Sequence, residues 1–325
     1  MTSIKVKYHP SATTGRKCRE VKKYIKPASE QSLSNFMQGV ICHLKQLGKI
    51  RTSETYTSTL ASFMKFRAGQ DIILCDIDGN MMMQYEAWLK GKGICPNTTS
   101  FYMRILRAVY NRAVENELTE QRYPFKHVYT GIDKTVKRAM PLKAIRQIKG
   151  LDLANNHKLD YARDMFLFSF YTRGMSFVDM AYLRKSDLKN GIITYRRRKT
   201  GQLLTVKWEK CMEDIIAKYH GNHATRYLLP IITNPMADER TQYHNAISRV
   251  NIALKEVARL AGLHIPLTMH VARHCWASVA RSKNIPISII SEGMGHDSEA
   301  TTRIYLASLD TSAIYRANSL ILKDL

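Results

Sequence analysis

The chain has 325 residues, of which 45% are hydrophobic and 24% charged, and its 50 lysines and arginines outnumber 27 acids to give a net charge of +23. This composition is typical of a globular protein of about two domains. No apolar run approaches the roughly 18 residues of a membrane helix, and the basic N-terminus has no apolar signal core. The six cysteines form no C-x-x-C pair, which suits reduced thiols. These features exclude a secreted or membrane protein and predict a cytoplasmic one.

The first part of the chain predicts a helical bundle behind a flexible arm. Residues 1–28 are polar and basic and show no periodicity, which is typical of such an arm. From Leu33 onward, apolar residues recur at helical spacing until Gly48. Three further amphipathic stretches follow before residue 122. Their candidate first residues are Thr52 or Ser53, Asp78, and Asn97. We therefore predict a four-helix domain over residues 29–121.

The segment from 122 to 139 breaks the helical pattern, is basic, and contains Pro124 and Gly131, so we interpret it as an interdomain linker. The second domain is expected over residues 140–325. Helical patterns occupy 141–149 and 158–172 and most of the chain after 210. Between them, two β-compatible runs, 192–198 and 203–208, flank Lys199-Thr200-Gly201-Gln202 and predict a hairpin. The expected fold class is mainly α with a small β-sheet (α+β).

The positive charge is concentrated in residues 1–50 and 101–200. The stretch from Lys134 to Gly150 holds basic residues and no acid, and Arg196 to Lys199 forms a second cluster. Such localised charge favours a polyanionic partner, most simply nucleic acid. The alternative is a solvated basic face. An anionic membrane surface is disfavoured, because no basic amphipathic helix with exposed large apolar residues stands out.

The last third of the chain carries the pattern with chemical content. His270 and Arg273 stand three residues apart, so on a helix both project from one face. Together they offer an imidazole and a guanidinium fork to one anion, such as a phosphate. His296 follows Gly295, whose turn would aim the imidazole back toward the same point. Tyr305 follows nine residues later and would present a phenolic oxygen there.

A metal site is not predicted. His270 and His274 have the spacing of a zinc pair, but the H-E-x-x-H pattern fails because residue 271 is valine. His274 and Cys275 also lack further closely spaced ligands. No cofactor motif is present in the sequence either.

The ordered set of His270, Arg273, Gly295-His296 and Tyr305 resembles the signature of the tyrosine recombinase (phage integrase) family, which places H-x-x-R, Gly-His and a tyrosine after Thr-Thr in this order. Lys199 resembles the lysine that this family carries in a hairpin turn. The resemblance covers roughly residues 30–310, in a layout similar to short invertase-like and Xer-like members. It implies an N-terminal four-helix, SAM-like core-DNA-binding domain and a C-terminal catalytic domain with a tail helix.

One position departs from the family pattern. The first catalytic arginine of the family normally stands two residues after a glycine, and that position here is Ser176. An arginine occurs three residues earlier, at Arg173. If the segment is helical, residues 173 and 176 share a face and the long Arg173 side chain reaches the same phosphate. We therefore expect Arg173 to replace the missing arginine; the alternative is that Arg173 pairs with Asp179 or the DNA backbone and the site works with one arginine fewer.

The resemblance implies transesterification at a DNA phosphodiester. Tyr305 is then the nucleophile that forms a covalent 3′-phosphotyrosyl link. His270 assists proton transfer and Lys199 protonates the leaving 5′-oxygen. The non-bridging oxygens are held by Arg173, Arg273 and His296. Neither a metal nor ATP is expected to take part.

The implied partners are double-stranded DNA with specific recombination sites and further copies of the chain, as a homotetramer on synapsed DNA. The outcome would be DNA inversion or integration and excision, in a cytoplasmic, nucleoid-associated protein. The short segment before the first helix favours an invertase or resolution enzyme over an arm-type integrase. Two alternatives remain open: a catalytically impaired, recombinase-like DNA-binding regulator, and a type IB topoisomerase-like relaxing enzyme.

Overall fold

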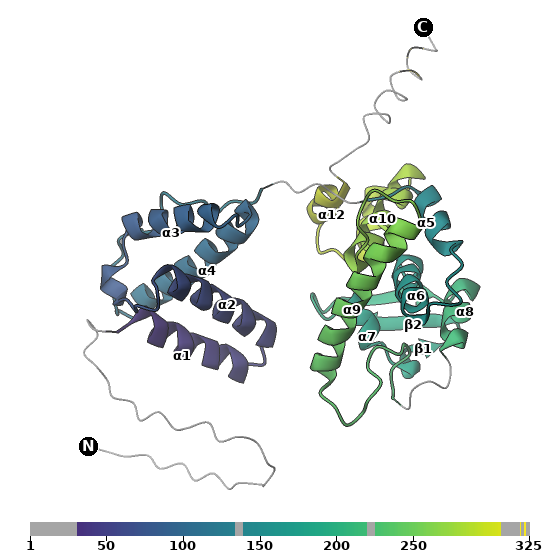
Figure 1. The fold of residues 1–325 in the computed structure, drawn as a ribbon, viewed down its shortest axis with the longest axis horizontal. Coiled ribbons are helices and arrows are strands. Elements are labelled where there is room, and N and C mark those ends of the chain that lie inside the picture. Colours follow the sequence, from purple (N-terminus) through teal and green to yellow (C-terminus); the bar gives the residue numbers. More distant parts are fainter. Residues whose placement is uncertain (1–30, 134–138, 220–224, 307–318, 320–321, 323–325) are drawn as a thin grey trace. The chain divides into compact units, whose positions relative to one another are not determined.

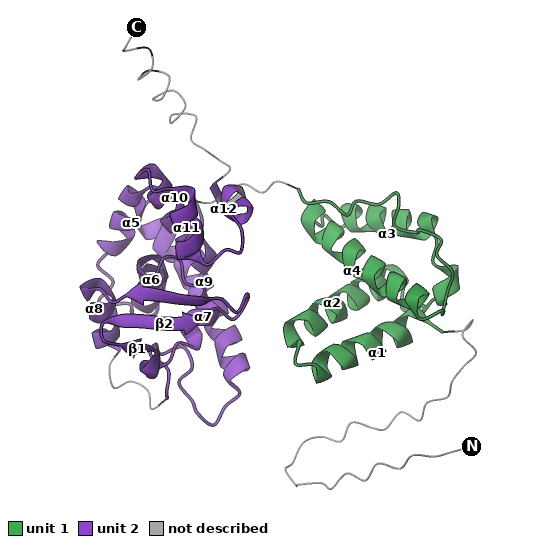
Figure 2. Ribbon diagram, turned by 180° about the vertical axis from the view of Figure 1, so that it is seen from behind, with its two compact units in different colours: residues 1–134 green, residues 135–325 purple. Residues whose placement is uncertain are grey.

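The computed structural model describes residues 31–133, 139–219 and 225–306, together with Ser319 and Leu322, and only the backbone of Ile304 and Tyr305. The arm expected over residues 1–28 and most of the expected tail helix lie outside the described residues. The chain divides into two compact units, Met1–Lys134 and Thr135–Leu325 (Figure 2). Each unit has its own hydrophobic core. Within the described residues, no helix is long and apolar enough to cross a membrane.

Four α-helices make up most of the described part of the first unit (Figure 1). They are α1 (Leu33–Gln46), α2 (Ile50–Phe66), α3 (Gly79–Gly91) and α4 (Pro96–Glu115), with a short 3-10 helix, η2 (Leu74–Asp76), before α3. The four predicted helices are thus confirmed. Their inner faces meet around Phe63 and Tyr85, whose rings pack edge to face with centroids 5.1 Å apart.

The predicted helix starts are confirmed in one case and wrong in another. Asp78 caps α3, and its side chain accepts a hydrogen bond from the Met81 backbone N–H at 2.8 Å. The expectation that Thr52 or Ser53 caps α2 is wrong, because the helix already begins at Ile50. Ser53 is buried inside that helix and donates its hydroxyl hydrogen to the Ile50 carbonyl at 2.7 Å. A hydroxyl that bonds back to its own helix mimics a cap in sequence without being one.

The segment after α4 is fastened to the first unit, although it was expected to begin the linker. Phe125 and Val128 are buried in the core of that unit. The side chain of Asn97 exchanges two hydrogen bonds with the Asp133 backbone, at 3.0 Å and 2.8 Å. Ser100 donates to the Gly131 carbonyl at 2.5 Å. Residues 122–133 are therefore packed as part of the first unit.

The second unit surrounds one buried helix, α6 (His157–Tyr171), which contacts several other helices. Its neighbours are α5 (Leu142–Lys149), α8 (Lys210–Lys218), α9 (Glu239–Leu260) and α10 (Met269–Ser282). The remaining helices are α7 (Phe177–Ala181), α11 (Ile287–Met294), α12 (Glu299–Leu306) and the 3-10 helix η3 (Lys185–Asp187). The second half of α6, from Met165 to Tyr171, is apolar nearly all round, which explains why it shows little amphipathic contrast.

The sheet of the second unit has three antiparallel strands in the order β1-β2-β3. The predicted hairpin is confirmed as β2 (Ile192–Arg196) and β3 (Leu203–Lys207), with Ile193 opposite Val206. The two-residue strand β1 (Leu188–Lys189) was not expected from the sequence. The prediction of a mainly α fold with a small sheet is confirmed.

Candidate active site

The corner between α6 and α7 shapes one side of the candidate site. Helix α6 ends at Tyr171, and Arg173 and Gly174 follow in the left-handed backbone region with φ of 61° and 75°. Ser176 then caps α7, accepting from the Asp179 backbone N–H. The expectation that residues 173 and 176 share a helical face is wrong, because the left-handed pair separates them into different elements. Arg173 reaches the site from this corner instead.

Gly174 allows α10 to approach this corner closely. A Cβ atom at residue 174 would lie 2.7 Å from Arg273 Cα, so no other residue fits there without a shift of backbone. Arg273 Nη1 donates to the Gly174 carbonyl at 2.9 Å, and Nη2 donates to the Met294 carbonyl at 2.5 Å. Arg273 is buried. Both partners are uncharged carbonyls, so these bonds orient the guanidinium without neutralising it.

His296 lies directly beside Arg273. Gly295 ends α11 in the left-handed conformation, and His296 Nε2 is 3.0 Å from Arg273 Nη2. Because a guanidinium only donates hydrogen bonds, Nε2 must accept. The proton of the neutral ring then resides on Nδ1, which donates to Thr302 Oγ1 at 2.7 Å. Thr302, fully buried on α12, therefore selects the tautomer of His296.

Burial and nearby positive charge keep this imidazole neutral. Burial is the largest cause, followed by the charges of Arg273, Arg197 and Lys199, and together they lower the pKa of His296 to about 4 against the opposing charge of Asp297. At neutral pH the ring is therefore uncharged and its acceptor nitrogen is available to Arg273. The same shift shows that three cationic side chains gather around His296.

Arg197 is a member of this cluster that sequence reasoning missed. It is only 7% exposed, and its Nη1 donates to the Gly295 carbonyl. A Cβ atom at residue 295 would lie 2.9 Å from Arg197 Cδ, so the hairpin and the end of α11 touch at a glycine. The signal for this arginine is the alternation along the hairpin, where residues 193, 195 and 197 are buried and 192, 194, 196 and 198 exposed.

Lys199 stands in the turn between β2 and β3, where its side chain is exposed and near enough to His296 to lower the pKa of that imidazole. Asp179, a buried acid on α7, holds this turn in place through hydrogen bonds. One carboxylate oxygen accepts from the Arg198 backbone N–H at 2.9 Å, and the other accepts from the Ser176 hydroxyl at 2.6 Å. Ser176, which stands where the family normally has its first arginine, thus helps to hold the hairpin that carries Lys199.

Arg173 lies against α11 at Gly293, with Nη1 3.8 Å from where a Cβ of residue 293 would stand. Its Nε is buried without a hydrogen-bond partner among the described residues. Burial and Asp179 raise the pKa of Tyr195 to about 12, while Arg273, Arg197 and Arg173 oppose the rise. The structure therefore brings these three guanidinium groups near one buried ring.

The other two predicted residues lie on the helices that frame the cluster. His270 is exposed in the first turn of α10, and its ring packs edge to face on His274 with centroids 4.6 Å apart. Tyr305 belongs to α12, three residues after Thr302, and its side chain is outside the described atoms. Helix α12 is thereby tied to His296 through the same hydrogen bond that sets the tautomer.

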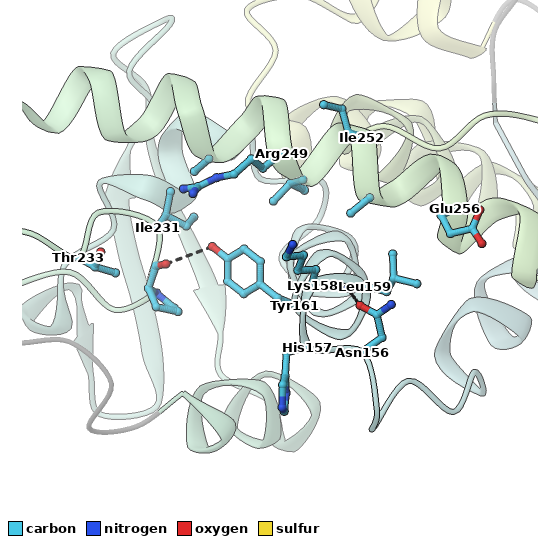
Figure 3. A pocket seen from close by; sticks show the side chains of 14 residues that line it. Asn156, His157, Lys158, Leu159, Tyr161, Ile231, Thr233, Arg249, Ile252 and Glu256 are labelled. Atoms are coloured by element: carbon cyan, nitrogen blue, oxygen red, sulfur yellow. Dashed lines mark hydrogen bonds between the residues drawn. The ribbon is translucent and has the colours of Figure 1, made fainter.

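Two hollows in the second unit differ in their relation to this cluster. A cavity of about 660 Å³ lies between the start of α6 and α9, where Figure 3 shows Tyr161 directing its hydroxyl toward the Pro230 carbonyl, 3.2 Å away. None of the predicted catalytic residues lines that cavity. A smaller hollow of about 370 Å³ is lined by Gln202, Gly295 and His296 and opens beside the cluster. Within the described residues no group of three or more His, Cys, Asp or Glu could hold a metal ion.

The class of protein follows from the two kinds of unit and the cationic cluster. A helical first unit and a second unit that presents arginines, a hairpin lysine and a histidine beside a tyrosine-bearing helix are the layout of a tyrosine recombinase. The model of the phage integrase SAM-like domain matches residues 32–128, and that of the phage integrase family matches residues 144–312. The chain belongs to the phage integrase family.

Curated relatives and solved structures agree with this assignment. The chain is 22% identical over 273 residues to tyrosine recombinase XerD of Pseudomonas putida, covering 78% of this chain and 85% of the relative. It is 24% identical to tyrosine recombinase XerA of Pyrococcus furiosus over 73% of this chain and 80% of the relative. The fold is similar to a lambda integrase dimer bound to a COC′ core site, with a TM-score of 0.64, 15% identity, and coverage of 85% and 95%. It is also similar to the Tn1549 transposon integrase with transposon right end DNA, with a TM-score of 0.63, 15% identity, and coverage of 90% and 100%.

Proposed function

We propose that this protein is a site-specific DNA recombinase that cuts and rejoins strands through a covalent 3′-phosphotyrosyl intermediate. The observation that carries the proposal is the convergence of Arg273, Arg197 and His296 beside the helix of Tyr305. Such a cluster matches the needs of phosphoryl transfer, in which charge builds up on the non-bridging oxygens. Cationic side chains then supply the charge that a metal supplies elsewhere, and neither metal nor ATP is needed.

Each residue has a distinct task in the proposed reaction. The Tyr305 oxygen attacks the scissile phosphorus and the P–O5′ bond breaks, so the bond energy is kept in the phosphotyrosine for the rejoining step. His270 assists removal of the phenolic proton, and Lys199 protonates the leaving 5′-oxygen. Arg273 and His296 hold the non-bridging oxygens. For this, His296 takes up a proton on Nε2 when the anionic phosphate binds, so that this nitrogen donates to a phosphate oxygen in place of accepting from Arg273.

The missing first arginine is compensated, in this proposal, by Arg173. Its buried Nε without a described partner supports an anion-binding role. Arg197 adds a second guanidinium from the hairpin, held in place by the Gly295 carbonyl. Ser176 no longer contributes charge; it fixes Asp179 and thereby the hairpin turn. The cluster therefore keeps its positive charge although the family position is a serine.

The proposed partners are duplex DNA containing specific recombination sites and three further copies of the chain. The net charge of +23 supports a polyanionic partner. Solved structures with this fold include a lambda integrase tetramer bound to a Holliday junction, with a TM-score of 0.65. We propose inversion or integration and excision as the outcome, and a location with the chromosomal DNA.

Covalent capture tests the proposal. Purified wild type and Tyr305→Phe would be incubated with host genomic DNA in EDTA, quenched with detergent and digested with nuclease. We expect a nucleotide adduct on the Tyr305 peptide of the wild type alone, and sequencing of the trapped DNA identifies the recombination site. DNA binding without any adduct in wild type would contradict the catalytic proposal and favour a DNA-binding regulator.

A further inference from the structure

Tyr123 is an unusual residue on the surface of the first unit. Its side chain is 70% exposed, whereas the next two residues, Pro124 and Phe125, are buried. Its backbone has φ of 50°, in the left-handed region that aromatic residues rarely adopt. Because a proline follows, the favoured backbone of Tyr123 would be extended. Two local preferences are thus violated at a residue whose side chain packs little against its own protein.

Hydrogen bonds hold Tyr123 in this conformation. Its backbone N–H donates to Gln121 Oε1 at 3.0 Å, and its carbonyl accepts from the Lys126 backbone at 3.1 Å. Gln121 Nε2 in turn donates to Asn111 Oδ1 on α4 at 3.3 Å. The strain is therefore imposed by surrounding contacts, which is the pattern of strained residues at functional sites.

The whole loop is fastened to the bundle on both sides of Tyr123. The Tyr110 hydroxyl of α4 donates to the Glu120 carbonyl at 2.7 Å. The Arg122 guanidinium donates to the Cys75 carbonyl at 3.1 Å. With Phe125 and Val128 buried, little ordering of this loop remains to oppose binding. The tyrosine ring is therefore presented on a rigid support.

Two cations flank the ring in sequence. Arg122 and Lys126 are both exposed, and the exposed acid before them in the loop is Glu120. Helix α4 contacts this loop through the hydrogen bond between Gln121 and Asn111. The exposed face of the same helix carries Arg107. An exposed aromatic ring flanked by two cations suits duplex DNA, whose phosphates pair with the cations while a sugar packs on the ring.

We propose that Tyr123 is a DNA-contacting residue whose ring packs against a sugar of the bound duplex. The inference rests on the proposed function, because it takes duplex DNA as the partner. It goes further in assigning to this loop an aromatic contact that tolerates many sequences, since every nucleotide of the duplex offers a sugar. The backbone strain is the cost of presenting the ring to the DNA.

The test combines DNA affinity with thermal stability in the full-length chain. Tyr123→Gly removes the ring and relieves the left-handed strain, and Tyr123→Phe keeps the ring. Ala68→Gly is a matched control, because Ala68 is also exposed in the first unit with a positive φ of 52° but has no ring. The probe is a fluorescent duplex of mixed sequence, followed by anisotropy at low salt.

We expect Tyr123→Gly to lower the affinity for the duplex by about five-fold or more, through loss of the ring's contact with the sugar, while its melting temperature stays the same or rises. Tyr123→Phe and Ala68→Gly should bind as the wild type does. Unchanged affinity of Tyr123→Gly, with wild type binding normally, would overturn the inference and leave the recombinase proposal standing. Failure of the wild type to bind any duplex would overturn both. Equal losses in Tyr123→Gly and Ala68→Gly would also overturn the inference.

Discussion

Three consecutive arginines of the hairpin have three different environments. Arg196 is exposed and donates to the Gly201 carbonyl across the turn at 2.6 Å. Arg197 is buried and reaches Gly295 beside His296. Arg198 is exposed, and its guanidinium lies over the ring of Tyr182, 3.8 Å from the centroid. Only the middle arginine contributes to the cationic cluster, so the three are not interchangeable despite their identical chemistry.

Replacing Arg197 tests its place in the site. We expect Arg197→Ala to slow formation of the covalent complex by about 10²- to 10³-fold, as the loss of one charge-stabilising donor does. The neighbouring Arg196→Ala serves as control and should change the rate by less than about five-fold, because an exposed side chain outside the cluster is removed. The measurement is the rate of covalent trapping on the captured site. Equal rates for Arg197→Ala and the wild type would remove Arg197 from the proposed mechanism.

At this scale the sequence predicts the site incompletely. His270, Arg273, His296 and Tyr305 are predicted as site residues because their order resembles the family signature, and the structure places Arg273 beside His296. Arg197 was not predicted, because the alternation along the hairpin places it on the buried face with Ile193 and Tyr195 but does not show that it contacts Gly295 at the end of α11. In the sequence, Ser176 shows only that the family's first arginine is missing from its usual position. Its hydrogen bond to Asp179 is seen only in the structure.

Among the elements, the corner between α6 and α7 has the strictest requirement. Gly174 combines a positive φ with direct contact to the backbone of α10. The corner fixes the Gly174 carbonyl that orients Arg273. A side chain here would push α10 away from α6, and the guanidinium would move with it.

Gly174→Ala is therefore expected to abolish covalent trapping and to destabilise the second unit by about 1–3 kcal/mol. Gly191→Ala is the matched control. Gly191 also has a positive φ, of 71°, but nothing lies within 4 Å of the position of its missing Cβ. We expect this control to lose a little stability and to keep its trapping activity. If both variants trap equally well, the close approach at Gly174 is not needed to orient Arg273.

Elements with a clear period were predictable, and their junctions were not. The four helices of the first unit and the hairpin follow from apolar spacing. The start of α2 was misplaced because Ser53 resembles a cap but bonds within its helix. The end of α6 was predicted within one residue, but the left-handed turn at Arg173 that follows it was not, because a left-handed arginine has no sequence signature comparable to that of glycine. Residues 122–133 look like a linker in composition, yet side-chain bonds from α4 hold them.

The whole molecule consists of two units with separate cores. Phe63 is fully buried in the core of the first unit, and Phe166 is fully buried in that of the second. Separate cores predict separate unfolding, because a cavity in one unit removes contacts only there.

Calorimetry of the full chain checks this. We expect Phe63→Ala, at a cost of about 3–5 kcal/mol, to lower one unfolding transition and leave the other in place. Phe166→Ala should do the converse. A single transition that moves in both variants would mean that the two units unfold as one cooperative body.

The alternation along the hairpin also restricts how this sequence can change in evolution. A one-residue slip of β2 and the arginines after it against β3 would exchange the buried and exposed sides, so that Arg196 or Arg198 would face Gly295 and the hydrophobic residues Ile193 and Tyr195 would face water. Because all three candidates are arginines, the cationic group would survive such a slip, but the core would not. Three arginines in a row therefore keep a guanidinium at the site even if the strand register shifts by one residue. The buried Ile193 and Tyr195 are what prevent such a shift.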